Sequence, residues 1–189
     1  MKKTLGATDT FFPVPAALVA GGTMAEHNVI TVAWIGIVSS SPPTVGISLR
    51  KTRHSLGIIR QCGEFTVNIP PARLFAEVDY CGLVSGRDVD KFEAAGLTPT
   101  ESSVVAAPII DECPYNMECR VTGEHEIGEW VLLLGEIVET HADAEVVGAD
   151  SRIDIAKLNP LVYCAAIREY WELGRKLGDG FNAGRSIHQ

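Results

Sequence analysis

The chain contains a long run of β-branched and apolar residues that ends at a pair of prolines. From residue 29 to residue 38 most side chains are valine, isoleucine or small residues, with Trp34 among them. A helix has a compatible period, but the density of β-branched residues favours one strand over Val29–Val38. Proline has no N–H for a β-ladder, so we expect Ser39–Pro43 to form an extended turn.

Further strands are predicted before and after this run, mostly connected by short turns. The expected strands are Ala16–Ala20 with a break at Gly21-Gly22, Thr44–Leu49, Glu64–Ile69, Asn116–Glu126, Trp130–Thr140 and Pro160–Tyr163. The turn Ile127–Glu129 would connect two of them as a hairpin. Strands outnumber helices, which favours an antiparallel barrel with peripheral helices over a βαβ sheet. No GxGxxG follows a strand, which argues against a Rossmann nucleotide site.

Helical patterns are fewer and shorter. We expect helices at His54–Cys62, with Thr52 or Ser55 as its cap, at Arg73–Leu83 and at Asp90–Gly96. The last of these would end at its glycine. The pattern from 146 to 157 leaves helix and strand open.

Length and charge limit the classes of function. A chain of 189 residues fits one domain, and its net charge of −8 argues against nucleic acid and anionic membranes as partners. No segment has the run of about 18 apolar residues that a membrane span needs, and the N-terminus does not resemble a signal peptide. The five cysteines show no CxxC spacing, so we expect reduced thiols in a cytoplasmic protein and no metal site.

Three fixed cations, Arg50, Lys51 and Arg53, lie between a predicted strand and a predicted helix. An arginine can hold two phosphate oxygens at once, and lysine adds a point charge. Ser55 and the first amides of the helix would add donors at its positive end. In an acidic chain this cluster favours a phosphate site, although such clusters also occur in solvated loops.

Two polar stretches nearby suit the rest of a long, flat, phosphorylated ligand. The strand edge from Asn28 to Ala33 offers backbone donors and acceptors, together with an apolar wall, to a flat ring. Ser39, Ser40 and Ser41 could bind hydroxyl or phosphate oxygens. The alternatives are a core strand with a capping asparagine and an exposed serine loop. The histidines show no spacing for a metal or a catalytic triad, and no GxSxG is present, so we expect no side-chain nucleophile.

The motifs, taken in order, resemble those of a known family. They are Pro13–Pro15, Asn28–Thr31, Pro42-Pro43, Arg50–Ser55, Glu64–Asn68, Asp90–Phe92, Gly135–Val138, Pro160–Tyr163 and Tyr170–Gly174. Together they resemble the flavin reductase-like, FMN-binding split-barrel proteins, and among these the flavoredoxin type. The resemblance covers most of the chain.

The resemblance implies a fold, a cofactor and an assembly. The fold would be mainly β, an antiparallel Greek-key split β-barrel with peripheral helices, forming a single FMN-binding domain over residues 1–189. Family members are homodimers with flavin at the subunit interface, where Trp34, Trp130, Tyr170 and Trp171 would line the flavin or the interface. The residues implied in FMN binding are Asn28, Val29, Ile30, Thr31, Ala33, Ser39, Ser40, Ser41, Ser48, Arg50, Lys51, Arg53, Ser55, Lys91 and Phe92.

One departure from the family bears on function. Many NAD(P)H-dependent members have Gly-Asp-His where this chain has Gly128-Glu129-Trp130. An indole can stack on a flat ring but cannot take the acid–base role of a histidine. We therefore expect an electron-transfer flavoprotein or flavin-dependent reductase, with a redox protein or a small molecule as electron donor or acceptor. The alternatives are an NAD(P)H:flavin oxidoreductase and a non-catalytic flavin-binding module.

Overall fold

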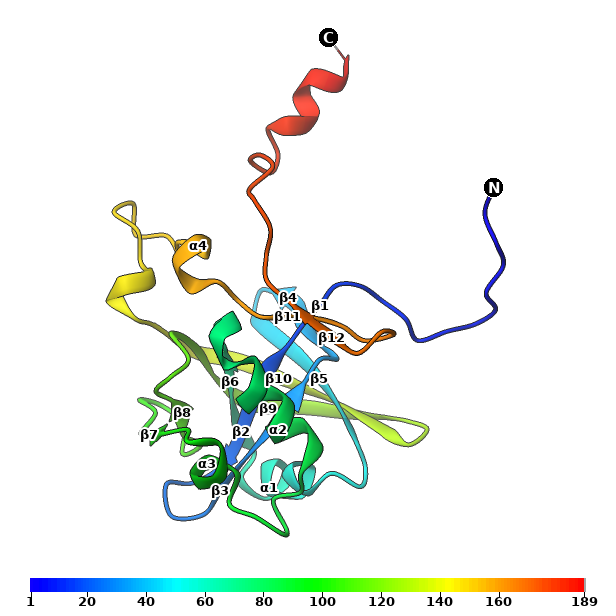
Figure 1. Cartoon of the computed structure of the whole chain (residues 1–189). Helices are drawn as coiled ribbons and strands as arrows, with labels where there is room; N and C mark the ends of the chain where they lie inside the picture. Colours follow the sequence, from blue (N-terminus) through cyan, green and yellow to red (C-terminus); the bar gives the residue numbers. More distant parts are fainter. Residues whose placement is uncertain (189) are drawn as a thin grey trace.

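A seven-stranded antiparallel sheet forms the body of the protein (Figure 1). The computed structural model describes residues 1–188. The strand order is β3-β2-β6-β9-β10-β5-β4. The strands are β2 (Ala17–Gly22), β3 (His27–Val32), β4 (Ile35–Ser40), β5 (Pro43–Arg50), β6 (Glu64–Ile69), β9 (Tyr115–Ile127) and β10 (Trp130–Ala142). The prediction of an antiparallel, mainly β fold with peripheral helices is confirmed.

Only two residues, Ala33 and Trp34, connect the strands at opposite edges of this sheet. In a flat sheet seven strands wide the edges would lie about 29 Å apart, at about 4.8 Å per strand. The three Cα steps across the link span at most about 11 Å. The sheet therefore has to roll up until β3 approaches β5. The backbone N–H of Ser48 donates to the Trp34 carbonyl at 2.9 Å, which extends the pairing of β4 with β5 into the link.

The predicted single strand Val29–Val38 is therefore wrong. The segment forms two strands, and each pairs with a different neighbour: β3 with β2, and β4 with β5. The residues on both sides of the break favour extended backbone, so local propensity cannot locate it. The predicted turn Ser39–Pro43 is also too long, because Ser40 and Pro43 are register partners in β4 and β5.

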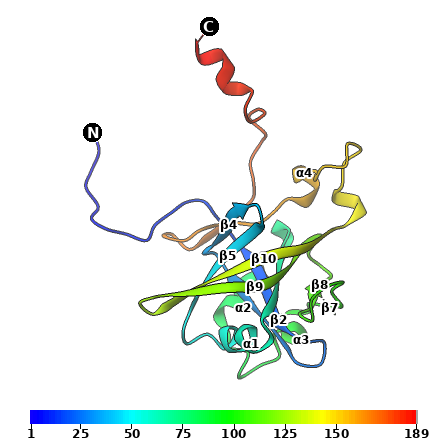
Figure 2. The same ribbon diagram turned by 180° about the vertical axis from the view of Figure 1, so that it is seen from behind.

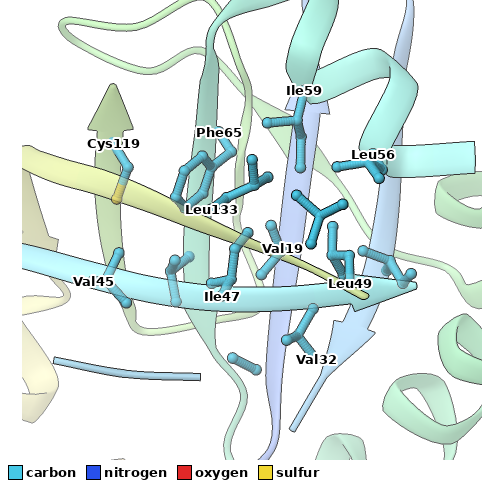
Figure 3. Close-up of a cluster of buried hydrophobic side chains, with 14 residues drawn as sticks. Val19, Val32, Val45, Ile47, Leu49, Leu56, Ile59, Phe65, Cys119 and Leu133 are labelled. Carbon is cyan, nitrogen blue, oxygen red and sulfur yellow. The ribbon is translucent and has the colours of Figure 1, made fainter. Parts of the chain in front are cut away.

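The interior of the barrel is filled by alternating side chains from nearly every strand (Figure 3). In β5 the residues Val45, Ile47 and Leu49 are buried and point inward, while Ser48 and Arg50 lie on the other face. From β6, Phe65 packs into the same cluster. Such alternation is what a strand with one buried face requires.

Helix α1 (His54–Cys62) has the predicted bounds and closes one end of the barrel with Leu56 and Ile59 (Figure 3). The predicted caps are wrong. Arg53 occupies the N-cap position and makes no side-chain capping hydrogen bond. Ser55 instead accepts a hydrogen bond of 2.6 Å from Asn28 Nδ2, so a tertiary contact replaces the local cap.

Two further helices cover the outer face of β2 and β3. The predicted helix Arg73–Leu83 is a 3₁₀ turn, Ala72–Leu74, followed by α2 (Phe75–Leu83), whose Val78 and Cys81 face a second core as expected. Helix α3 (Lys91–Ala95) is capped by the Asp90 carboxylate and ends at Gly96 in the left-handed region, in agreement with the prediction.

The long hairpin β9–β10 crosses the barrel and extends beyond it (Figure 2). Its turn is Gly128-Glu129, and Gly128 has φ +58°, which favours glycine. Both predicted strands of this hairpin are confirmed with slightly longer bounds. The glycines Gly21 and Gly22 belong to β2, so the expected break there is wrong.

Small elements complete the described chain. The strands β1 (Val14–Pro15), β11 (Val162–Cys164) and β12 (Glu169–Trp171) form a second sheet, and β7 (Pro99–Thr100) pairs with β8 (Ile109–Ile110). The segment left open at 146–157 contains the end of a 3₁₀ turn (Ala144–Val146) and most of α4 (Ile155–Leu158). A last 3₁₀ segment is Ala183–His188, and both chain ends extend away from the body (Figure 1). No described helix has the length and apolarity of a membrane span.

One buried carboxylate anchors the loop beside the barrel. Glu118 is fully buried and accepts hydrogen bonds from the backbone amides of Ser103, Val104 and Val105 at 2.7, 2.7 and 2.8 Å. It also contacts His141 Nε2 at 2.6 Å. Burial raises the pKa of Glu118, but the hydrogen bonds from His141 and the amides together outweigh burial and hold this pKa below its usual value.

Glu118→Gln should lower the free energy of unfolding by about 2–4 kcal/mol at pH 7, because an amide group would face buried N–H donors. Urea denaturation measures this, with the exposed Glu101→Gln as the matched control. The pKa of Glu118 is lower in the folded than in the unfolded protein. The stabilisation by its carboxylate is therefore present above the unfolded-state pKa and is lost as the pH falls. The difference between wild type and variant should therefore shrink below about pH 4. Equal stability at pH 7 would contradict the anchoring role.

Candidate functional site

Two adjoining cavities open where the barrel seam meets α1 and α2. One has a volume of about 230 Å³ and is lined by several aromatic residues, and we name it the aromatic lobe. The other has a volume of about 490 Å³ and is lined by most of the nearby cations, and we name it the cationic lobe. The two lobes share the lining residues Ile30, Trp34, Arg50, Arg53 and Trp130. They therefore form one continuous site.

Three side chains, Trp34, Trp130 and Arg50, meet at the junction of the lobes. The rings of Trp34 and Trp130 lie 5.4 Å apart with an interplanar angle of 40°, and the Arg50 guanidinium lies 5.1 Å from the centre of the Trp130 ring. Arg50 and Trp130 are register partners in β5 and β10, so the sheet itself sets this contact. A cation above an indole face is attracted by the ring quadrupole. The two indole rings thus form an aromatic wall at the junction, with a cation beside it.

The far wall of the aromatic lobe comes from α2 and the second sheet. Tyr163 and Tyr170 have ring centres 5.0 Å apart, and the Tyr170 hydroxyl donates to Asp79 Oδ1 at 3.2 Å. All three residues line the lobe. Thr31 of β3 lines it too, and its hydroxyl donates to the Val78 carbonyl of α2, which fixes this helix against the strand.

The cationic lobe contains four basic side chains: Arg50, Arg53, Arg87 and Lys91. Three of them donate to main-chain carbonyls: Arg53 Nη1 to Gly82 at 3.5 Å, Arg87 Nη1 to Thr52 at 3.3 Å, and Lys91 Nζ to Cys81 at 2.7 Å. In residues 1–188 none of the four forms an ion pair with a carboxylate. Their charges therefore remain available to an anion.

Lys91 is the buried member of this group, with 4% of its surface exposed. Burial lowers the pKa of its ammonium to about 8; the neighbouring Cys81 thiol acts against this shift, and Arg53 adds to it. A bound anion would raise this pKa, because an opposite charge nearby favours the protonated form of the lysine.

Nine of the predicted site residues line the two lobes: Asn28, Ile30, Thr31, Ala33, Ser48, Arg50, Arg53, Ser55 and Lys91. Of the predicted aromatics, Trp34, Trp130 and Tyr170 line the lobes as well, whereas Trp171 does not. The strand edge and the basic cluster, predicted as the two ends of one site, are thus brought together.

The other six predicted residues lie outside both lobes. Val29 and Phe92 are buried in the second core, because their side chains point from β3 and α3 toward α2. Ser39, Ser40 and Ser41 lie at the end of β4 and in the following turn. Lys51 forms an ion pair with Glu126 on the β9–β10 hairpin.

Sequence reasoning missed the loop that follows α2. Arg87 lines the cationic lobe, and Gly86 packs so closely on β3 that a Cβ there would lie 2.0 Å from Asn28 Oδ1. Asp79 in the aromatic lobe was also missed. The only local signal was the turn-forming sequence Ser85-Gly86-Arg87 directly after a predicted helix. This signal does not indicate that the turn packs on a strand some 60 residues earlier in the chain.

We expect the Lys91 ammonium to titrate near pH 8 in the ligand-free protein. NMR of lysine side chains measures this, with Lys91→Met to assign the signal. Inorganic phosphate should raise the midpoint, because a bound anion stabilises the charged form. A midpoint above pH 10 without phosphate would contradict the buried, singly bonded environment of this ammonium.

Comparison with known proteins agrees with this fold. The chain is similar to the flavoredoxin of Desulfovibrio vulgaris, with 34% identity and a TM-score of 0.92 over 97% of this chain and 100% of the other. It is similar to a flavoredoxin from Methanosarcina acetivorans, with 29% identity and a TM-score of 0.91 over 99% and 100%.

A protein with a split barrel domain from Shewanella frigidimarina is 23% identical and has a TM-score of 0.80 over 89% of this chain and 85% of the other, a likeness in fold. The fold is thus the split barrel that the motifs predicted. Residues 9–171 match the family described as the flavin reductase like domain. The chain therefore belongs to the flavin reductase-like family.

Proposed function

We propose that this protein is an FMN-binding flavoprotein of the flavoredoxin type, which acts as an electron carrier or as a flavin-dependent reductase. The observation that carries the proposal is the two-lobed cavity, which combines an aromatic wall with cations that form no ion pair with a carboxylate within residues 1–188. FMN has the same two-part chemistry, a flat ring at one end and a phosphate at the other. The flavoredoxins with similar structures support the same ligand class.

The residues present fit this cofactor. Arg50 and Arg53 border both lobes and stand beside the start of α1, where free backbone N–H groups favour an anion. Ser55 lies in that first turn with its hydroxyl held by Asn28. These residues would bind the phosphate, while Ile30, Ala33 and the Trp34–Trp130 pair would border the ring. The whole chain would act as one domain.

Bound FMN supplies the redox chemistry, and the protein holds and orients it. The chain contributes cations for the phosphate, apolar contacts that exclude water from part of the ring, and an exposed side for a partner. We propose that the partner is a redox protein or a small-molecule donor or acceptor. Trp130 supports transfer that does not begin with a nicotinamide, because an indole cannot take the acid–base role of the histidine that many NAD(P)H-dependent members have there.

An NAD(P)H:flavin oxidoreductase is the second candidate. It is favoured by the number of cations in the cationic lobe, which exceeds what one phosphate needs. A phosphate monoester carries about −1.5 to −2 at neutral pH.

We also propose that the protein is a homodimer in the cytoplasm. Large apolar side chains are exposed on both terminal segments, including Phe11 at 74% and Phe181 at 103% exposure, and on β4, where Ile37 is 63% exposed. A second copy of the chain would cover such surface. The five cysteines are free thiols, which suits a reducing compartment.

Arg53→Ala should weaken FMN binding about 10- to 100-fold, because a charge-assisted contact to phosphate is worth about 1.5–3 kcal/mol. The affinity for riboflavin, which has no phosphate, should change by less than about threefold. Lys51→Ala is the matched control: it removes a cation two residues away that pairs with Glu126. Fluorescence titration of the ligand-free protein measures the FMN and riboflavin affinities of the wild type and of both variants. Equal losses for FMN and riboflavin would contradict the phosphate assignment.

The carrier function predicts a specific outcome when purified protein is mixed with NADH and excess FMN. Absorbance at the nicotinamide band should fall by no more than about one equivalent per bound flavin. Continued turnover would favour the oxidoreductase. A bound flavin that resists every mediator and cell extract would instead indicate a non-catalytic module.

A further inference from the structure

One carboxylate without an assigned role lines the aromatic lobe. Asp79 of α2 is the single acidic residue in the lining of this lobe. It forms no ion pair with a basic side chain within residues 1–188. Its side chain instead accepts one hydrogen bond, of 3.2 Å, from the Tyr170 hydroxyl. A negative charge without a cationic partner therefore borders the lobe in which the proposed flavin ring would lie.

The second sheet holds this carboxylate at the lobe through Tyr170. Tyr163 and Tyr170 are register partners in β11 and β12, and their ring centres lie 5.0 Å apart. Both rings line the lobe. Burial, and then the charge of Asp79, raise the pKa of the Tyr170 hydroxyl, so this phenol stays protonated and remains a donor at neutral pH. The pairing of two strands thus fixes the group that binds Asp79.

The charge of Asp79 would not be cancelled when FMN is bound. Arg50 and Arg53 line the same lobe, but they also line the cationic lobe, where they would bind the phosphate. A phosphate monoester carries about −1.5 to −2 at neutral pH, which offsets both guanidinium groups. Arg87 and Lys91 line the cationic lobe but not the aromatic lobe. The charge left on the side of the ring is therefore the negative charge of Asp79.

A negative charge beside a flavin opposes its reduction. Reduction by two electrons with uptake of one proton leaves one extra negative charge on the ring, and a nearby carboxylate repels this charge. Charge near the ring nitrogens is one of the means by which a protein tunes a flavin. Asp79 is exposed, so water and salt weaken the repulsion, and the expected effect is moderate.

We propose that Asp79, held in place by Tyr170, lowers the reduction potential of the bound flavin. This inference rests on the proposed flavin site. The two electrons come from the redox protein or small-molecule donor of the proposed function, and the charge of Asp79 favours their transfer to the acceptor over their retention on the ring. Asp79 acts through its charge and takes no part in the transfer of protons or electrons.

The experiment compares the reduction potential of bound FMN in the wild type, Asp79→Asn and Tyr170→Phe. Asparagine removes the charge, but its amide oxygen can still accept the hydrogen bond from Tyr170. Asp111→Asn is the matched control, because Asp111 is also an exposed aspartate and lies outside both lobes. Anaerobic titration with dithionite and mediator dyes measures the potential from the flavin absorbance. Thermal melts identify a variant that does not fold, and Asp79→Ala replaces Asp79→Asn in that event.

Asp79→Asn should raise the potential. Reduced FMN should bind about tenfold more tightly relative to oxidised FMN than it does in the wild type, which corresponds to about 30 mV for a two-electron couple. Tyr170→Phe should raise the potential by a smaller amount, because the carboxylate keeps its charge but loses its anchor. Asp111→Asn should change the same affinity ratio by less than about threefold, because a distant exposed charge is screened.

The inference is overturned if Asp79→Asn leaves the potential unchanged or lowers it, if Asp111→Asn raises it as much, or if Tyr170→Phe has no effect. Each of these outcomes leaves FMN binding by the wild type intact. A wild-type protein that does not bind FMN at all refutes the proposed function itself.

Discussion

The two-residue link between β3 and β4 is the constraint on which the rest of the structure depends. Ala33 and Trp34 connect the two edges of a seven-stranded sheet, so the sheet cannot stay flat. Rolling brings β3 beside β5 and encloses one core that includes side chains from both edges, such as Val32 of β3 and Ile35 of β4. The seam is therefore a place where backbone from distant strands meets without forming a regular ladder.

The candidate site lies on this seam for the same reason. Trp34 belongs to the link, and its ring meets Trp130, which the register of β10 places opposite Arg50 at the end of β5. A short connection, a hairpin end and a strand end thus converge at one point. Residues at such ends can point into a cavity, whereas residues in the middle of the strands are committed to the core.

The C-terminal end of α2 contributes the polar half of the site. Its carbonyls at Cys81 and Gly82 accept hydrogen bonds from Lys91 and Arg53. The last carbonyls of a helix lack intrahelical partners and carry partial negative charge, so they attract cations. The helix end satisfies one donor of each cation, and both residues line the cationic lobe. The same contacts connect the site to the second core, because α2 also buries Val78 and Cys81 there.

The sequence by itself determined the mainly β architecture and the bounds of α1 and β6, which follow from local patterns of β-branched density and proline stops. That the strand edge at Asn28 and the basic cluster belong to one site was implied by the resemblance of the motifs to a known family. Only the tertiary structure decided that the run from 29 to 38 splits in two, that Lys51 turns to Glu126, and that Arg87 joins the site. Each of these depends on pairing or packing between segments far apart in the chain, and local propensity carries no information about which distant partner is available.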